Sequence, residues 1–341
     1  MLQPLLKKLL KKPLTLLADR LSAAPDRRLV HNALSNLLHQ TRKQGAHSPN
    51  HLKLNLNNAQ IAIISDQHKG CGDAADDFEM AKPAFQTALL HYLEKGFTLI
   101  NNGDAEELWE NKPAVVMDYQ KQMLDLENAF HQKGRYFRTF GNHDLEWKYQ
   151  VPLKQFLEPV FGKKLQVFEA LLLHAELEAD RFEIFITHGH QGDRQSDGNK
   201  FSSWAVAALW TPLQRYLKIN VNTISSSYDL ANKHNRILYE WSAQQSNLVL
   251  ITGHTHHPVF ASLGKQEQHQ YSEAVPTYFN SGCCCFEDGD ITLLEIENGM
   301  IRLVKWGLIE GEIGRKVLVE EGLAALLERI VSRKEAKLLR H

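Results

Sequence analysis

The sequence of 341 residues contains only four cysteines, and three of them are consecutive, at 283–285. Neighbouring residues of a strand point to opposite faces, so this spacing does not indicate a disulfide framework and favours a reducing compartment. No apolar run is long enough to predict a transmembrane helix. Lysines such as Lys7 and Lys8 interrupt the leucines near the start, so no secretory signal is predicted either. We therefore expect a cytoplasmic protein.

An excess of charge of one sign is also missing. The formal net charge is −1 and no basic stripe is present, which argues against binding to long nucleic acid. Repeats and low-complexity tracts are absent as well. An apolar fraction of 43% and a charged fraction of 23% are ordinary for a globular protein with a large core. The length fits one large domain with extensions, or two domains.

The first 50 residues have a helical composition and little chemistry. Within residues 1–17, leucines recur on one face at helical spacing and lysines lie opposite. Such a basic amphipathic helix can lie on an anionic membrane, which would put the protein peripherally at the inner face of the membrane. It can equally dock its leucines on its own domain or on a second subunit. Residues 41–50 are interpreted as a linker.

From residue 51 onward, short apolar runs alternate with amphipathic helical segments, which indicates an α/β fold. We predict strands over 52–56, 61–65, 97–100, 136–140, 182–187, 248–252, 278–286, 291–296 and 301–306. We predict helices over 83–95, 114–132, 153–161 and 315–338, and a helical insertion over 191–245. Asn298-Gly299 predicts a hairpin between the last two strands.

Five of these strands end in side chains that can bind a metal ion. Asp66 and His68 follow the strand over 61–65, two positions apart, so their side chains point the same way. The residues at the other four ends are Asp104, Asn142 with His143, His188, and His254 with His256. A single histidine at such a place is usually a surface or hydrogen-bonded residue. Ligands gather beyond the carboxyl ends of strands, however, so five such ends predict one shared site.

In order and spelling, these clusters resemble the signature of the calcineurin-like metallophosphoesterase superfamily. The matching motifs lie between residues 58 and 300 and read Asp66-Gln67-His68, Gly103-Asp104, Gly141-Asn142-His143-Asp144, His188 and Gly253-His254-Thr255-His256. The resemblance implies an α+β sandwich of two mixed β-sheets flanked by helices. It implies a catalytic domain over 51–310, with a helical extension over 1–50 and a C-terminal helix over 311–341.

The resemblance further implies phosphoester hydrolysis at a binuclear centre with two divalent ions, Mn being favoured over Fe, Zn or Co. One ion would be held by Asp66, His68 and His256, the other by Asn142, His188 and His254, and Asp104 would bridge them. Water between the two ions would attack phosphorus in line. His143 would stabilise the transition state or protonate the leaving oxygen. His190 is an alternative ligand to His188, and Asp144 is expected to be structural.

The residues that follow Gly103-Asp104 do not match the motif typical of Ser/Thr protein phosphatases. An acidic residue followed by Trp109, together with the insertion, is similar to the UDP-2,3-diacylglucosamine pyrophosphatase branch. That branch has arginine where this chain has His143, and it lacks an extension like residues 1–50. We therefore expect hydrolysis of a small or lipid-linked phosphodiester or pyrophosphate. The alternatives are a general phosphodiesterase acting on cyclic nucleotides or nucleic acid, and a non-catalytic metal-binding scaffold.

The insertion over 191–245 lies between two predicted ligand strands, so it must lie next to the site. Its aromatics and its basic residues, such as Arg194, could form a lid over the substrate, which Asn142 and His143 would also contact. The alternative is a helical pair that packs its aromatics on the sheet. Residues 283–285 are interpreted as small residues of a buried strand, with redox or metal-binding roles as alternatives. The C-terminal helix could pack on its own domain or on a partner, so an oligomer is an open alternative.

Overall fold

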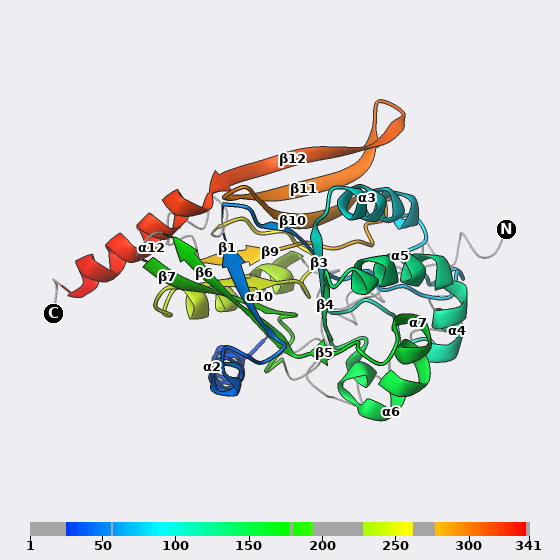
Figure 1. The fold of residues 1–341 in the computed structure, drawn as a ribbon, viewed down its shortest axis with the longest axis horizontal. Helices are drawn as coiled ribbons and strands as arrows, with labels where there is room; N and C mark the ends of the chain where they lie inside the picture. The colour runs from blue at the N-terminus through cyan, green and yellow to red at the C-terminus, as the bar shows by residue number, and fades with distance from the viewer. Residues whose placement is uncertain (1–24, 56, 178–179, 194–227, 262–276, 339–341) are drawn as a thin grey trace.

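Two mixed β-sheets form the centre of the molecule, and helices cover their outer faces (Figure 1). The computed structural model describes residues 25–55, 57–177, 180–193, 228–261 and 277–338. This architecture is the α+β sandwich expected from the sequence. Residues 1–17, predicted to form a basic amphipathic helix, lie outside the described residues, as do Arg194 and most of the insertion. Among the helices that the structure describes, none is long and apolar enough to cross a membrane.

The first sheet has five strands in the order β1-β6-β7-β8-β9. Its strands are β1 (His51–Asn55), β6 (Ala170–Leu177), β7 (Asp180–Thr187), β8 (Leu248–Thr252) and β9 (Tyr278–Asn280). β6 pairs antiparallel with β7, whereas β7, β8 and β9 run parallel. β6 had no predicted counterpart, and it places β1 parallel at the edge of this sheet.

The second sheet has seven strands in the order β12-β11-β10-β2-β3-β4-β5. Its strands are β2 (Gln60–Ile64), β3 (Thr98–Asn102), β4 (Tyr136–Thr139), β5 (Val167–Phe168), β10 (Ile291–Glu297), β11 (Met300–Ile309) and β12 (Glu312–Gly322). β2 to β5 run parallel, so their carboxyl ends meet at one edge. β10 and β11 form the predicted hairpin, with positive φ at both Asn298 and Gly299.

Helices cover the two sheets on opposite sides. α2 (Arg27–Gln44) and α10 (Tyr228–Ser242) pack on the first sheet, while α3 (Lys82–Glu94), α4 (Pro113–Tyr119) and α5 (Lys121–Gln132) pack on the second. The shorter elements are η1 (Leu145–Lys148), α6 (Gln150–Pro152), η2 (Leu153–Leu157) and α7 (Glu158–Phe161), and α12 (Leu323–Leu338) ends the described chain. Asp26 caps the N-terminus of α2, because its carboxylate accepts backbone N–H bonds from Arg28 and Leu29.

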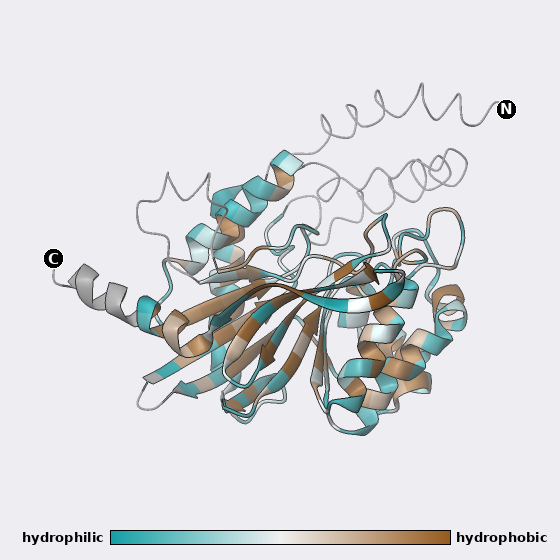
Figure 2. Cartoon of the chain, turned by 90° about the horizontal axis from the view of Figure 1, so that it is seen from above, coloured by the Kyte–Doolittle hydropathy of each residue, from teal (hydrophilic) through white to brown (hydrophobic). Residues whose placement is uncertain are grey.

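Three apolar cores hold these layers together, and Figure 2 shows apolar residues concentrated along the strands and the inward faces of the helices. The central core lies between the sheets, where Ile63 of β2 meets Ile184 of β7 and Ile251 of β8, all of them buried. Each such side chain contributes about 1.5–3 kcal/mol relative to exposure. The continuous apolar runs of these strands follow from their burial on both faces.

The C-terminal prediction is wrong over 315–322, which forms strand β12 and not helix. β12 pairs with β11 along its length, so tertiary pairing satisfies its backbone, and β-branched Val317 and Val319 suit a strand. The helix begins only at Leu323, so the C-terminal segment from 311 is a strand followed by a helix. Leu326, Leu327 and Ile330 of α12 are buried against the central core.

Other boundaries also differ from the predictions. The single helix expected over 114–132 is broken at Gln120, whose buried side chain donates to the carbonyl of Gly70 in the loop after His68. The segment 153–161 is helical but contains the π turn η2. The expected linker begins later, because α2 continues to Gln44.

The strand predicted over 278–286 ends at Asn280, so the cysteines 283–285 lie in a loop and not in a buried strand. Gly282 has a φ of 78° there, which turns the chain out of the strand direction. The next backbone N–H groups then bond elsewhere, since Cys284 donates to the carbonyl of Asp66.

Candidate metal centre

The carboxyl ends of β2, β3, β4, β7 and β8 meet at one edge of the two sheets. Parallel register aligns β2 with β3 and β3 with β4 in the second sheet, and β7 with β8 in the first. The residues that directly follow these strands are Asp66 and His68, Asp104, Asn142 and His143, His188, and His254 and His256. The topology therefore brings every predicted ligand to one place.

The backbone is strained at this edge. Five of the seven predicted ligands have a positive φ, which is uncommon outside glycine: Asp66 (55°), His68 (49°), Asp104 (49°), His254 (68°) and His256 (57°). Strain of this kind costs of order 1–3 kcal/mol per residue and concentrates at functional sites. It directs side chains that would otherwise diverge toward a common centre.

Two glycines of the motifs are required because the ligand carboxylates lie against them. A Cβ at Gly141 would lie 2.1 Å from Oδ1 of Asp104, and one at Gly253 would lie 2.3 Å from Oδ2 of Asp66. Both contacts are far below van der Waals distance. The glycines therefore allow close packing of the carboxylates against neighbouring backbone.

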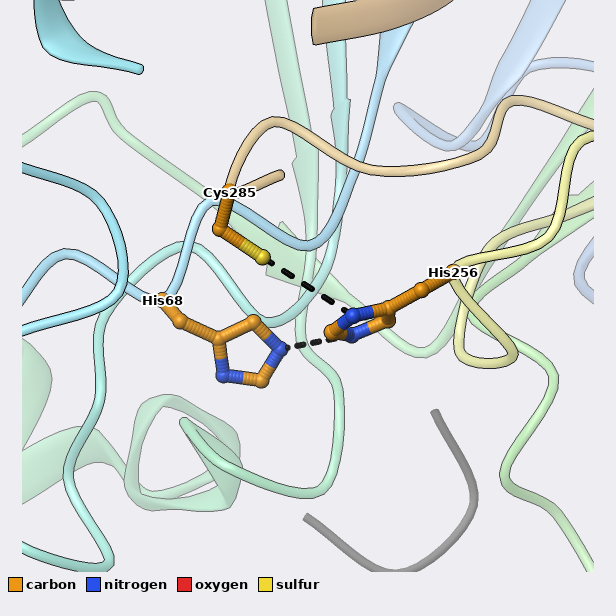
Figure 3. A group of neighbouring side chains, drawn as sticks. All are labelled: His68, His256 and Cys285. Atoms are coloured by element: carbon orange, nitrogen blue, oxygen red, sulfur yellow. Dashed lines mark hydrogen bonds between the residues drawn. The ribbon is translucent and has the colours of Figure 1, made fainter. Parts of the chain in front are cut away.

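The first half of the centre is formed by Asp66, His68 and His256. Nε2 of His68 lies 3.0 Å from Nε2 of His256 (Figure 3). Nε2 of His256 in turn lies 3.3 Å from Oδ1 of Asp66. Nε2 of His68 is also 3.7 Å from Oδ2 of Asp104. Two imidazole nitrogens and two carboxylate oxygens thus converge in a buried space, as ligands of one divalent ion would.

The second half contains buried polar atoms that lack a well-aligned hydrogen bond. Oδ1 of Asn142 has no hydrogen-bond partner within the described parts of the chain. Nε2 of His188 and Nε2 of His254 make no well-aligned hydrogen bond there, although the carboxylates of Asp104 and Asp193 lie 3.0 and 3.8 Å from them. Leaving one such group unsatisfied costs about 1–3 kcal/mol. Asp104 lies beside them, with Oδ2 3.0 Å from Nε2 of His188, and Asp104, His188 and His254 could together hold an ion. The residues present therefore fit a second cation.

The two carboxylates of the centre are held in their charged form. Burial raises the pKa of Asp104, but the imidazoles of His188 and His143 hold it well below the usual range. Burial lowers the pKa of His188, but Asp104 and Asp66 raise it to about 9. The centre is therefore an anionic environment that favours cations, which is the electrostatic requirement of a metal site.

Glu107 is a site residue that sequence reasoning did not identify. Its Oε2 accepts hydrogen bonds from Nδ1 of His68 (2.9 Å) and Nδ1 of His143 (2.7 Å). Trp109 stacks on His143 with a ring separation of 4.0 Å, and its Nε1 donates to the carbonyl of Asn142. The acidic residue before Trp109 was noticed only as a family trait, although its spacing from Asp104 was the available signal. Glu107 fixes both rings through Nδ1, so that Nε2 is the nitrogen of each ring that remains to act at the centre.

Asp144 lies beneath the centre and is hydrogen-bonded to the backbone of the turns that carry the ligands. Its carboxylate accepts backbone N–H bonds from Gly141 (2.6 Å) and Ala105 (3.0 Å), and it pairs with Arg138 at 3.3 Å. Burial raises its pKa to about 6. A buried network continues from there through ion pairs among Arg138, Lys69, Glu106 and Glu127. Sequence reasoning missed this network, because no motif marks it.

His188 and His190 were alternative ligands in the sequence, and their positions in the structure favour His188. His188, and not His190, lies within reach of both Asp104 and His254. The ring of His190 is 5.4 Å from that of His188, and burial together with His188 lowers its pKa well below the usual range. His257 is half-buried with its ring 5.4 Å from Tyr228, at the start of α10.

The described part of the insertion, α10, packs its aromatics Tyr239 and Trp241 on the first sheet. It also reaches the centre, next to which the insertion was predicted to lie, through residues that no sequence signal indicated. Nε2 of His234 lies 2.9 Å from the carbonyl of Gly189, and Oδ1 of Asn235 accepts from Oγ1 of Thr255 at 3.0 Å. α10 thus fixes the loops that carry His188 and His254.

The chain matches a known protein family. A model of the calcineurin-like phosphoesterases matches residues 59–258. Among solved structures, the chain is similar to a Vps29 single mutant from Entamoeba histolytica, with 14% identity, a TM-score of 0.30, and coverage of 77% of this chain and 99% of that chain. It is also similar to Vacuolar Protein Sorting 29 from Cryptosporidium parvum, with 11% identity, a TM-score of 0.32, and coverage of 77% and 98%. No curated protein matches the sequence.

Proposed function

We propose a substrate class and residue roles for this chain from the premise that it belongs to the calcineurin-like phosphoesterase family. Its general activity is metal-dependent hydrolysis of phosphoesters. We infer that its substrate is a phosphodiester or pyrophosphate, either small or lipid-linked. The observation that carries this inference is the set of buried ligand atoms beside Asp104 that lack a well-aligned hydrogen bond, next to a histidine held by Glu107.

In this proposal Asp66, His68 and His256 hold one divalent ion, and Asn142, His188 and His254 hold the other. Asp104 contributes to both, because its carboxylate lies within 4 Å of His68 and His188, which belong to different halves. When bound, two such ions supply activated water and neutralise phosphoryl oxygens. Mn is the favoured metal, with Fe, Zn or Co as alternatives, since the ligands are oxygen and imidazole nitrogen.

His143 acts on the leaving group in this scheme. Glu107 accepts from its Nδ1, which leaves Nε2 available to donate a proton or a hydrogen bond to the departing oxygen. Burial lowers the pKa of His143, but Glu107 and Asp104 together raise it above its usual value. The raised pKa keeps more of the imidazole protonated near neutral pH. Stacking by Trp109 fixes the orientation of the ring.

The charges beneath the centre favour a diester or pyrophosphate over a phosphomonoester. Lys69 and Arg138 are fully buried and already paired with Glu106, Glu127 and Asp144. They are therefore not free to neutralise the second charge of a terminal phosphate. An internal phosphate carries one negative charge fewer and needs less compensation. The spelling Glu107-x-Trp109 supports the UDP-2,3-diacylglucosamine pyrophosphatase branch as one instance of this class.

The test is hydrolysis by the full chain, stripped of metal and then supplied with Mn, of two chromogenic substrates, bis(p-nitrophenyl) phosphate and p-nitrophenyl phosphate. We expect metal-dependent cleavage with kcat/KM higher for the diester. Preference for the monoester would overturn the proposed substrate class. Without cleavage of either by a chain that binds two ions, the scaffold alternative would be favoured. If the diester is cleaved, assays with a lipid-linked pyrophosphate and with a cyclic nucleotide will show which of these substrate classes the chain hydrolyses.

The lipid-linked alternative has a second test at residues 1–17. A basic amphipathic helix there would bring the enzyme to an anionic surface that holds its substrate. We expect the full chain to float with anionic vesicles and to remain behind with zwitterionic ones. Equal behaviour with both would count against the membrane contact, without affecting the metal centre.

A further inference from the structure

The loop after β9 carries Cys283, Cys284 and Cys285, which the proposed mechanism does not use. Its backbone is fixed against the candidate metal centre. The N–H of Cys284 donates to the carbonyl of Asp66 (3.0 Å), and the carbonyl of Cys283 accepts from the N–H of Thr292 (2.9 Å). Together these two bonds tie the loop to a metal-ligand residue on one side and to β10 on the other. The loop therefore forms a wall of the first half of the centre.

The three side chains of this loop alternate in direction. Cys284 is fully buried in the core beneath the second sheet, with Sγ 3.9 Å from the carbonyl of Thr292. Sγ of Cys285 instead lies 3.8 Å from Nδ1 of His256, as the dashed line in Figure 3 shows. Burial raises the pKa of the Cys283 thiol, but the nearby Cys285 thiol and His256 imidazole lower it to about 6. Two thiols therefore face a predicted metal ligand, and the one between them faces away.

His256 needs an acceptor at the position that the sulfur occupies. Its Nε2 lies near Asp66 and His68, so Nδ1 is the nitrogen that faces away from the ion site. A metal-bound histidine almost always donates its other ring N–H to an acceptor, which fixes the tautomer and the orientation of the ring. Glu107 has this function for His68. For His256, sulfur of Cys285 lies where a carboxylate or carbonyl oxygen would be expected.

We propose, resting on the two-metal function above, that Cys283 and Cys285 are positioning residues that hold His256 through Nδ1 and so set the affinity of the first half of the centre for its ion. The sulfurs keep the proton on Nδ1 and leave Nε2 free for the metal. Cys285 is also only half-buried, so a maleimide can serve as a probe of its thiol. In the reaction with a maleimide, sulfur bonds to one alkene carbon and the thiol proton passes to the other. The thioether that forms is too large to keep His256 in place.

The test is a titration of the metal-stripped full chain with Mn²⁺ by calorimetry, with the bound ions counted by elemental analysis. The wild type should bind two ions. The double variant Cys283→Ala/Cys285→Ala should lose about 10–100-fold in affinity at one site and keep the other, the loss typical of removing such a partner. Cys284→Ala is the matched control and should bind both ions as the wild type does. Wild-type affinity for both ions in the double variant would overturn the inference.

Two further readouts separate positioning from a merely structural role. Cys285→Ser retains an acceptor and should recover part of the affinity that Cys285→Ala loses, at equal Tm. With Co²⁺ bound, we expect no sulfur-to-metal charge-transfer band; its presence would make Cys285 a ligand and overturn the positioning role. If the affinity of Cys285→Ser were no higher than that of Cys285→Ala, the positioning role would be overturned as well.

N-ethylmaleimide provides a test that needs no substitution of the buried Cys283. Labelling located to Cys285 by mass spectrometry should weaken binding of one ion in the wild type and in Cys284→Ala, but not further in the double variant. Labelled Cys285 with unchanged Mn²⁺ affinity would contradict the inference. If the wild type binds no metal at all, the proposed function fails; if it binds two ions and the thiols have no effect, only this inference fails.

Discussion

Two buried polar clusters lie against each other below the carboxyl ends of the strands, and their counter-charges have different sources. In the ion network, the cations Lys69 and Arg138 are paired with carboxylates of the same chain. In the candidate metal centre, the carboxylates of Asp66 and Asp104 face imidazoles, and Oδ1 of Asn142 has no hydrogen-bond partner among the described residues. The first cluster is neutralised by the chain itself, and the second is built for cations from outside.

Asp144 joins the two clusters. It pairs with Arg138 on one side, and on the other it accepts from the backbone N–H of Gly141 and, at 3.3 Å, of Asp104. The network therefore fixes the turn that carries the shared ligand Asp104. Burying ion pairs contributes little net stability, but it can hold a geometry in place. The comparison indicates that the chain uses one charged cluster to position the other.

The largest expected effect is on the ion network. Arg138→Met leaves Asp144 buried without its cation and Glu106 paired with Lys69 alone, and this should lower the free energy of unfolding by about 3–5 kcal/mol. Urea unfolding measures the loss. Lys121→Ala is the control, because its exposed pair with Asp125 should contribute at most about 0.5 kcal/mol. Equal stabilities of the two variants would remove the distinction between the clusters.

The next effect concerns catalysis without metal loss. His143→Ala should lower kcat by about 10²–10⁴-fold, since a positioned acid is removed. Elemental analysis should still find two ions, because His143 is not among the proposed ligands. His39→Ala, at an exposed position of α2, is the control and should keep full turnover. Retained turnover in His143→Ala would contradict the proposed role.

Metal addition should stabilise the chain through the candidate metal centre and not through the ion network. At a Mn²⁺ concentration of 100 Kd for one site, the free energy of unfolding should rise by about 2.7 kcal/mol. Thermal or urea unfolding with and without Mn²⁺ measures this gain. His188→Ala should reduce the gain, because a proposed ligand atom beside Asp104 is removed. An unchanged gain in this variant would place the ion elsewhere.

The smallest effect is a shift in pH dependence. Burial lowers the pKa of His143 from 6.5, but Glu107 and Asp104 raise it above that value. Because a general acid must be protonated, turnover should fall as pH rises through the raised pKa. Glu107→Gln removes one of the two carboxylates, so this basic limb should move to lower pH, by about one unit for 1.4 kcal/mol of lost interaction. A limb that stays in place or moves to higher pH would contradict the role of Glu107.

Local signals in the sequence were sufficient for much of the fold. Short Ile-rich runs such as β2 were predicted within one residue, because burial on both faces leaves a continuous apolar pattern. The Asn298-Gly299 turn was predicted because few dipeptides tolerate two positive φ values. β12 was mistaken for helix, since its residues satisfy both periods and only pairing with β11 decides between them.

The candidate site was predictable where a ligand directly follows a strand, because topology alone then brings such residues together. What the sequence did not indicate is the support around them. Glu107 does not directly follow a strand, as the predicted ligands do. Arg138 and Glu106 pair although they lie near the ends of different strands, and His234 comes from a helix of the insertion. These contacts depend on tertiary packing, for which no local pattern exists.

The most direct test of the account is electron paramagnetic resonance of the Mn-loaded full chain, with metal content measured on the same sample. We predict two Mn²⁺ ions per chain and the spectrum of a coupled pair, because Asp104 lies between the two halves of the centre. One ion per chain, or two ions with the uncoupled signal of isolated Mn²⁺, would contradict the binuclear centre.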